Sequence, residues 1–297
     1  MDGHRNCHDL LRQASPWQGC DHRPGLGQLG QEDSLHPPLN WRLDIEYDGS
    51  VFRGWARQDG GVDTVQARLE RALQIALRTD RSIELTVAGR TDSGVHALGQ
   101  VASFEFDGEM PEMIVRSLNG LTPPQIAVRA VTPVSGFDAR RDAVSRTYCY
   151  RVLTRRPGSP FAANRAWWVS RAIEREALDC CAAALVGQHD FTAFTPTETY
   201  HKRFERIIHS AEWREEEGFL GGDILQFRVT GDSFMRNMVR ILVGTMIEVA
   251  DGSRSLANFE SLLKGAQRPD AGITAPPQGL YFVSVDYPDP PPRPVAG

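Results

Sequence analysis

The stretch from Val87 to Phe106 holds the residue types and spacing best suited to chemistry. It reads VAGRTDSGVHALGQVASFEF, a polar run with three glycines between two apolar segments that alternate as strands do. Loops held by a sheet commonly display catalytic groups. This loop offers Arg90, Thr91, Asp92, Ser93 and His96. By its chemistry, Asp92 is a candidate general base, nucleophile or metal ligand.

The same loop also has a purely structural interpretation. Asp-Ser-Gly is a turn signal, and an Asp in such a turn often bonds only its own backbone. For His96, a hydrogen-bonded structural role is a better explanation than catalysis. From the residues alone, Asp92 is therefore either a turn-forming residue or a reactive carboxylate.

The elements that must position this loop alternate between strand and helix patterns. WRLDIEYDG, from Trp41, has apolar residues with period two and ends in an Asp-Gly turn. A helix is expected from about Asp63, because Asp63 and Gln66 have the spacing of a capping box. Strands at SIELTVAGR, QVASFEF and QIAVRAVTPV and a helix at EMPEMIVRSLNG then give a βαββαβ order over residues 41–134.

The second part of the chain repeats much of this pattern. Strands are expected at RTYCYRVL, AWWVS, IIHSAEWR, DILQFRVTG and LYFVSVDY. Helices are expected near residues 173–186, from about Ser233 to Val249, and near residues 256–264. The sequence therefore predicts an α+β fold with two related ferredoxin-like (βαββαβ-type) halves, 40–145 and 146–288, largely antiparallel sheets and a central cleft.

The two ends of the chain lack these patterns. Residues 1–39 are rich in Gly, Pro, Gln, His and Asp and show no periodicity, so we expect a disordered N-terminal extension. Its histidines and cysteines match no common zinc spacing. Residues 289–297 form a Pro-rich tail. No secretory pattern begins the chain, and the apolar run 237–250 is too short to span a membrane, so we expect a cytoplasmic protein.

Composition bears on the partners and on the redox state. The formal charge of −5 argues against general affinity for nucleic acid, so any RNA site must be local. Between residues 140 and 156 there are six Arg and one carboxylate, which supplies such a local positive surface. The five cysteines show no disulfide framework.

Several short motifs follow one another along residues 41–288. They are EYDG at Glu46, GW at Gly54, TVQ at Thr64, GRTDSGVHA at Gly89, GQV at Gly99, FDAR at Phe137, RTYCY at Arg146, HDFTAF at His189, FMRNMVR at Phe234 and GLY at Gly279. Together they resemble the TruA family of tRNA pseudouridine synthases. Ser93 stands where that family usually has Ala. A match this long, with several fixed glycines, is far more specific than a short pattern.

The resemblance implies catalytic roles for three residues. Asp92 is the catalytic carboxylate, which either attacks C1′ of the ribose or removes the proton at C2′. Arg240 is the cation that keeps Asp92 ionised against burial, with a solvated or phosphate-bound Arg as the alternative. Tyr148 is the active-site tyrosine whose ring stacks on uracil.

The remaining candidate residues bind the substrate. Arg90 corresponds to an Arg that assists extrusion of the nucleotide from its stem. Thr91, Arg140 and Arg146 are further candidate contacts. Tyr150 is also kept as a candidate, although it shares a strand face with Tyr148 and a core aromatic is the alternative for either ring.

The resemblance also implies a substrate and an assembly. It implies conversion of uridines 38, 39 and 40 in the anticodon stem-loop of tRNA, in a homodimer that the tRNA spans, without cofactor or metal. Two other classes stay open from the residues alone. A non-catalytic RNA-binding module would need an aromatic-rich strand, and none is found. An Asp-dependent glycoside or phosphoryl hydrolase would need a second carboxylate in a motif or a Gly-rich phosphate loop, and neither stands out.

Overall fold

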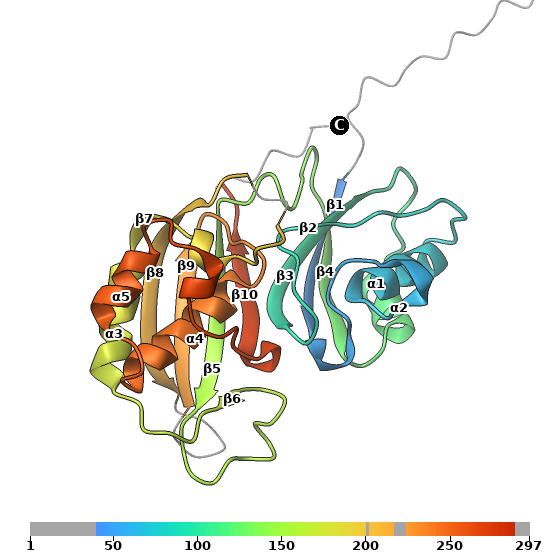
Figure 1. The fold of residues 1–297 in the computed structure, drawn as a ribbon. Helices are drawn as coiled ribbons and strands as arrows, with labels where there is room; N and C mark the ends of the chain where they lie inside the picture. Colours follow the sequence, from blue (N-terminus) through green and yellow to red (C-terminus); the bar gives the residue numbers. More distant parts are fainter. Residues whose placement is uncertain (1–39, 200–201, 217–223, 289–297) are drawn as a thin grey trace, which may run out of the picture. The chain divides into compact units, whose positions relative to one another are not determined.

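A computed structural model of the chain describes residues 40–199, 202–216 and 224–288 (Figure 1). These residues belong to one compact unit, residues 37–297. The expected N-terminal extension with its histidines and cysteines, and the Pro-rich tail, lie outside the described residues.

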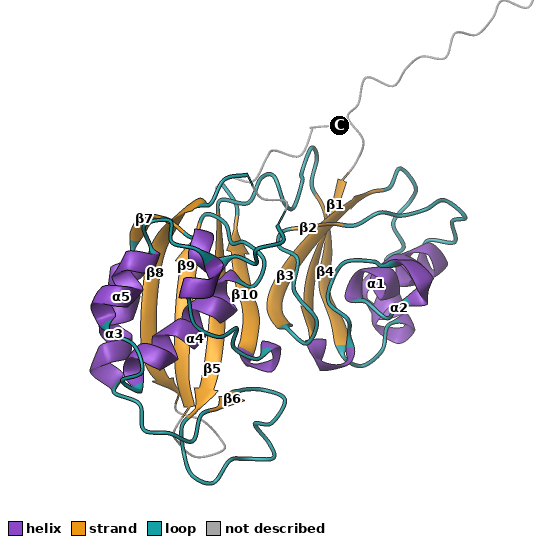
Figure 2. Cartoon of the chain, in the orientation of Figure 1, coloured by secondary structure: helices purple, strands orange, loops and turns teal. Residues whose placement is uncertain are grey.

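One sheet of ten strands carries the described fold (Figure 2). Its strands are β1 (Asn40–Tyr47), β2 (Thr86–Val87), β3 (His96–Glu105), β4 (Ile126–Pro133), β5 (Ser145–Leu153), β6 (Trp167–Trp168), β7 (Gly187–Asp190), β8 (Glu205–Glu216), β9 (Ile224–Gly231) and β10 (Leu280–Asp286). The order across the sheet is β4-β1-β3-β10-β5-β9-β8-β7, with β2 on β3 and β6 on β5. All neighbours along that path are antiparallel except β10 and β3.

Five helices accompany the sheet: α1 (Val65–Ala76), α2 (Ile114–Leu121), α3 (Arg175–Leu185), α4 (Met238–Ala250) and α5 (Leu256–Leu262). In Figure 1, α1 and α2 lie beside β1, β3 and β4, and α3, α4 and α5 lie over β5, β8 and β9. The α+β class and the largely antiparallel sheet are thus confirmed. The division into two ferredoxin-like halves stays a prediction, because both groups of strands belong to one sheet.

Helix α1 begins one residue later than expected. Thr64, not Asp63, is its N-cap, and the Thr64 hydroxyl accepts a hydrogen bond from the Ala67 amide. Asp63 instead forms an ion pair with Arg68 at 2.7 Å. Leu69 and Leu73 lie four residues apart on one face of the helix and are fully buried. The helix therefore packs into the core through this apolar face.

The strand expected over residues 82–90 is reduced to β2. Only Thr86 and Val87 pair with β3, opposite Ser103 and Ala102. The residues that follow leave the sheet and form the loop that carries Asp92. Strand β3 in turn begins earlier than expected, at His96.

Helix α4 begins at Met238, so the predicted start near Ser233 is wrong. Asn237 adopts a left-handed conformation, with φ 60°, which an α-helix cannot include. Eleven residues of α4 are buried, which makes it the central helix of this part of the core. No helix among the described residues is both long enough and apolar enough to cross a membrane.

Candidate active site

A cleft of about 710 Å³ opens between the Asp92 loop, strand β5 and the segment before α4. Among the described residues, its lining includes six arginines and a single carboxylate, that of Asp92. The arginines are Arg53, Arg90, Arg140, Arg146, Arg206 and Arg236. The local charge is therefore positive although the whole chain is acidic, which suits a polyanionic ligand.

The Asp92 loop is held from several sides. The Thr91 hydroxyl is 2.7 Å from the Tyr47 hydroxyl, and the Thr91 carbonyl accepts a bond from the Trp55 amide at 3.0 Å. The Ser93 hydroxyl donates to the Phe52 carbonyl at 3.2 Å. Ser93 thus adds a contact that the family's usual Ala lacks. Asp92 is fixed in place by neighbours on both sides along the chain.

Arg240 lies beside this carboxylate. Its Nη1 is 3.7 Å from Asp92 Oδ2. Its Nε donates to the Ala275 carbonyl at 2.7 Å, and its Nη1 donates to Asn237 Oδ1 at 3.0 Å. The side chains of Arg240 and Asp92 are 15% and 32% exposed, so this charge pair is partly shielded from water.

Burial and charge act on Asp92 in opposite directions. Burial raises the pKa of its carboxyl, while Arg240, Arg236 and the backbone amide of Asn237 lower it, and the pKa stays above its usual value. Burial also lowers the pKa of Arg240. The expected cation is therefore present, but it offsets only part of the desolvation. A carboxylate with a raised pKa is a stronger base and nucleophile than a free one.

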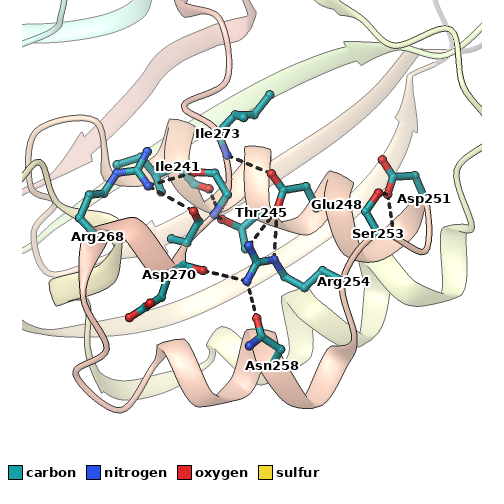
Figure 3. Close-up of polar contacts among 12 residues, drawn as sticks. Ile241, Thr245, Glu248, Asp251, Ser253, Arg254, Asn258, Arg268, Asp270 and Ile273 are labelled. Carbon is teal, nitrogen blue, oxygen red and sulfur yellow. Dashed lines mark hydrogen bonds and ion pairs between the residues drawn. The ribbon is translucent and has the colours of Figure 1, made fainter.

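A second network joins α4 to the segment that precedes Ala275 (Figure 3). Glu248 on α4 accepts from Arg254 at 3.0 Å and from the Ile273 amide at 3.1 Å. The Thr245 hydroxyl accepts from the Gly272 amide at 3.0 Å. The loop from Gly272 to Ala275 is thus fastened along α4. Through the Ala275 carbonyl this loop supplies one of the contacts that hold the Arg240 guanidinium.

Tyr148 forms one wall of the cleft. Its ring meets those of Phe234 and Phe282 edge to face, with centroids 5.0 and 5.2 Å apart. Burial raises the pKa of its phenol, so the hydroxyl stays neutral. Gly89 lies against this cluster, since a Cβ there would be 3.0 Å from Phe282 and 3.4 Å from the Tyr148 hydroxyl. A side chain at position 89 would therefore require the rings to shift by a few tenths of an ångström.

The other predicted binding residues divide into two groups. Arg90 and Arg140 are exposed at the cleft, and neither side chain has a hydrogen bond or ion pair to any other described residue. Arg146 lines the cleft, but its guanidinium donates to the carbonyls of Ala88, Ala143, Asp232 and Arg140. Arg146 therefore ties β5 to its surroundings.

Tyr150 lies away from the cleft. It is fully buried, and its hydroxyl donates to the Pro276 carbonyl at 2.7 Å. This placement favours the core aromatic that the sequence left open as its alternative. Thr91 lines the cleft, but its hydroxyl faces Tyr47.

His96 has a structural environment. It is buried, stacks on Tyr281 at 4.7 Å, and its Nδ1 accepts from the Gly49 amide at 3.2 Å. Among the described residues, no group of three or more His, Cys, Asp or Glu side chains could hold a metal ion.

Sequence reasoning gave no role to several residues of the cleft, among them Arg53, Arg206, Phe234, Arg236 and Asn237. Phe234 and Arg236 belong to the FMRNMVR segment, so that motif could have pointed to them. Arg53 and Arg206 belong to no pattern that would have marked them, because only the folded chain brings them to the cleft.

Comparisons with known proteins identify the family of this chain. A family model described as tRNA pseudouridine synthase matches residues 45–140 and 181–288. The tRNA pseudouridine synthase A of Leptospira biflexa is 39% identical over 256 residues, covering 85% of this chain and 95% of its own. That of Thermus thermophilus is 41% identical over 252 residues, covering 83% and 96%.

A further relative and a solved structure were also found. The tRNA pseudouridine synthase A of Geobacter sp. strain M21 is 40% identical, covering 84% of this chain and 99% of its own. A Cbf5-Nop10-Gar1 complex aligns with 70% of this chain and 44% of its own at a TM-score of 0.34 and 10% identity, too low to establish a shared fold. The family match and the bacterial relatives are sufficient to assign the family. The chain belongs to the family of tRNA pseudouridine synthases, isomerases that convert uridine in tRNA into pseudouridine.

Proposed function

We propose that this isomerase modifies uridines 38, 39 and 40 in the anticodon stem-loop of tRNA, with Asp92 as its catalytic carboxylate. One observation carries the proposal: Asp92 is the single carboxylate in a cleft lined by six arginines. A cleft of about 710 Å³ has room for an extruded nucleotide. The positions 38, 39 and 40 rest on the motif resemblance.

In the proposed reaction the bond between N1 of uracil and C1′ of ribose breaks, and a bond from C5 to C1′ forms. Asp92 either attacks C1′ or removes the C2′ proton, and both routes leave the carboxylate regenerated. The detached uracil turns within the cleft. After reattachment C5 loses its proton and N1 carries one, so the product is an isomer of the substrate.

The surrounding residues support these steps. Arg240, 3.7 Å from Asp92, favours the ionised carboxylate in a partly buried site. The rings of Tyr148 and Phe234 offer an apolar wall against which a flat base can turn. We assign substrate binding at this wall to Tyr148 and place Tyr150 behind it as support.

The proposed RNA contacts are electrostatic. The unpaired guanidiniums of Arg90 and Arg140 suit phosphate oxygens, which carry no sequence information. Such contacts read backbone shape, which suits an enzyme that acts on neighbouring positions. We further propose a homodimer spanned by tRNA, two related halves in each chain and a cytoplasmic location, all on the strength of the resemblance.

The test uses purified protein and unmodified tRNA transcripts. Pseudouridine is mapped by carbodiimide-dependent stops in primer extension, and tRNA binding is measured in parallel. Asp92→Asn is compared with Asp107→Asn, a control at an exposed position between β3 and α2 that does not line the cleft.

We expect stops at positions 38–40 for the wild type and for D107N, and none for D92N despite retained binding. Pseudouridine formed by D92N would refute the catalytic role. Stops at other positions would refute the substrate assignment. Free uracil would indicate a hydrolase, and binding by the wild type without any product would indicate a binding module.

A further inference from the structure

Asn237 has an unusual backbone conformation at a critical place. Its φ of 60° is left-handed, and Arg78 is the other non-glycine with positive φ among the described residues. Residues with a side chain rarely adopt this conformation, although Asn tolerates it better than most. Asn237 stands immediately before α4 and lines the cleft.

This conformation places Asn237 beside both members of the charge pair. Its side-chain Oδ1 accepts from Arg240 Nη1 at 3.0 Å, and its backbone amide lowers the pKa of the Asp92 carboxyl. The Nε of Arg240 is held separately by the Ala275 carbonyl at 2.7 Å. The guanidinium is therefore tethered at two points, neither of which is Asp92.

The tethers leave a gap between the charges. Arg240 Nη1 is 3.7 Å from Asp92 Oδ2, beyond the distance of an N–H to O hydrogen bond. A direct charge-assisted pair would stabilise the ionised carboxylate more strongly and occupy its oxygens. It would also make that carboxylate a weaker base and nucleophile.

We propose that Asn237 is a positioning residue, which holds Arg240 near Asp92 but out of hydrogen-bonding contact, so that the carboxylate stays available to the ribose. The inference rests on the proposed role of Asp92. Several charged or titratable groups share this environment. Arg90 lies on the loop of Asp92, and Tyr148 lies on β5. Arg236 lies just before α4, and Arg240 lies within it. The other arginines of the cleft are Arg53, Arg140, Arg146 and Arg206.

The experiment compares three variants. Asn237→Gly keeps the backbone amide and the left-handed conformation but removes the acceptor for Arg240. Asn237→Asp keeps an acceptor and adds a negative charge. Arg78→Gly is the matched control, because it makes the same backbone change at the end of α1, away from the cleft. Single-turnover rates at saturating tRNA are measured against pH, with KM for tRNA and melting temperature.

For N237G we expect Arg240 to close on Asp92. The plateau rate should fall on the order of 10-fold to 100-fold, with KM for tRNA nearly unchanged, and the acid limb of the profile should move to lower pH. For N237D the limb should move to higher pH, since a like charge raises the pKa of a carboxyl. R78G should match the wild type in rate and profile.

A wild-type plateau and limb in N237G would overturn the inference. So would an N237D profile without an upward shift, which decides the matter even if N237G fails to fold. If D92N keeps its activity, the proposed function itself fails. If D92N is inactive while N237G is normal, only the positioning role of Asn237 fails.

Discussion

Arg240 Nη1 and Asp92 Oδ2 lie 3.7 Å apart, although one belongs to α4 and the other to the loop between β2 and β3. Each residue is fixed by its own surroundings. Hydrogen bonds to Ala275 and Asn237 hold Arg240, while neighbours such as Thr91 position the Asp92 loop. The distance between the two charges therefore depends on how the fold places two separate segments. Substitutions at either residue can test its effect on catalysis.

Asp92 should cost the enzyme stability at neutral pH. Its pKa is raised on folding, so the folded protein favours the protonated form. The associated stability is present below the ordinary pKa of about 4 and is lost as pH rises through the raised value. D92N should therefore melt at a higher temperature than the wild type at pH 7.5. The difference should shrink toward acid pH in thermal unfolding, and a lower melting temperature for D92N at pH 7.5 would contradict this.

Substitutions of Arg240 should show whether the rate depends on its charge alone or also on the hydrogen bonds of its guanidinium. Arg240→Lys keeps the charge, but one ammonium cannot reproduce the planar fork that reaches both Ala275 and Asn237. We expect a loss in single-turnover rate on the order of 10-fold to 100-fold. Arg240→Ala should lose more and should move the acid limb upward, because the cation that lowers the pKa of Asp92 is gone. Equal rates for R240K and the wild type would show that charge alone suffices.

The ring of Tyr148 should matter more than its hydroxyl. Tyr148→Phe keeps the edge contacts with Phe234 and Phe282. Its activity and melting temperature should stay much closer to the wild type than those of Tyr148→Ala. The alanine variant should lose about 3–5 kcal/mol of unfolding free energy in denaturant titrations. If the phenylalanine variant were as inactive as the alanine variant, the hydroxyl would have a chemical role of its own.

Glu248 should affect catalysis from a distance. Glu248→Gln weakens the ion pair with Arg254 and the contact with the Ile273 amide. We expect a loss of about 1–2 kcal/mol in unfolding free energy. A reduced single-turnover rate should accompany it, because the loop that carries Ala275 is loosened. Glu260→Gln, at an exposed position on α5, should change neither quantity. An E248Q variant that lost stability but kept its full rate would separate this network from Arg240.

Salt should reveal which arginines meet phosphate. Arg140→Ala should weaken tRNA binding and reduce the slope of log affinity against log salt by about 1. Arg116→Ala, at an exposed position on α2 outside the cleft, should leave the slope unchanged. The comparison requires binding isotherms at several salt concentrations. An unchanged slope in R140A would remove Arg140 from the RNA contacts.

Long periodic segments were the most predictable part of the fold. Alternating residues in WRLDIEYDG and LYFVSVDY correctly predicted β1 and β10, because each strand is set by its own pattern. The start of α4 was not predictable, since nothing in the sequence pattern marks the left-handed Asn237, whose side chain contacts Arg240 only in the folded chain. The weak pairing of β2 also depends on tertiary packing.

The residues of the candidate site were predictable where a sequence motif identifies them. They were less predictable where their role depends on contacts that only the folded chain makes. Asp92, Tyr148 and Arg240 came from motifs, and all three lie in or beside one cleft. Arg146 shows the limit, because its sequence position cannot reveal that four backbone carbonyls engage its guanidinium. Phe234 shows the opposite case, since a residue within a quoted motif gained significance only from its contact with Tyr148.

Strand β10 joins β3 on one side and β5 on the other, through the pairs of Tyr281 with His96 and with Cys149. Strand β10 thus connects the strands of the first part of the chain to those of the second. On the ribosome, the start of β3 at His96 and Ala97 would lack its partner on this side until residues 280–286 had emerged. The nascent enzyme should consequently remain unable to modify tRNA until residues 280–286 have been synthesised and paired.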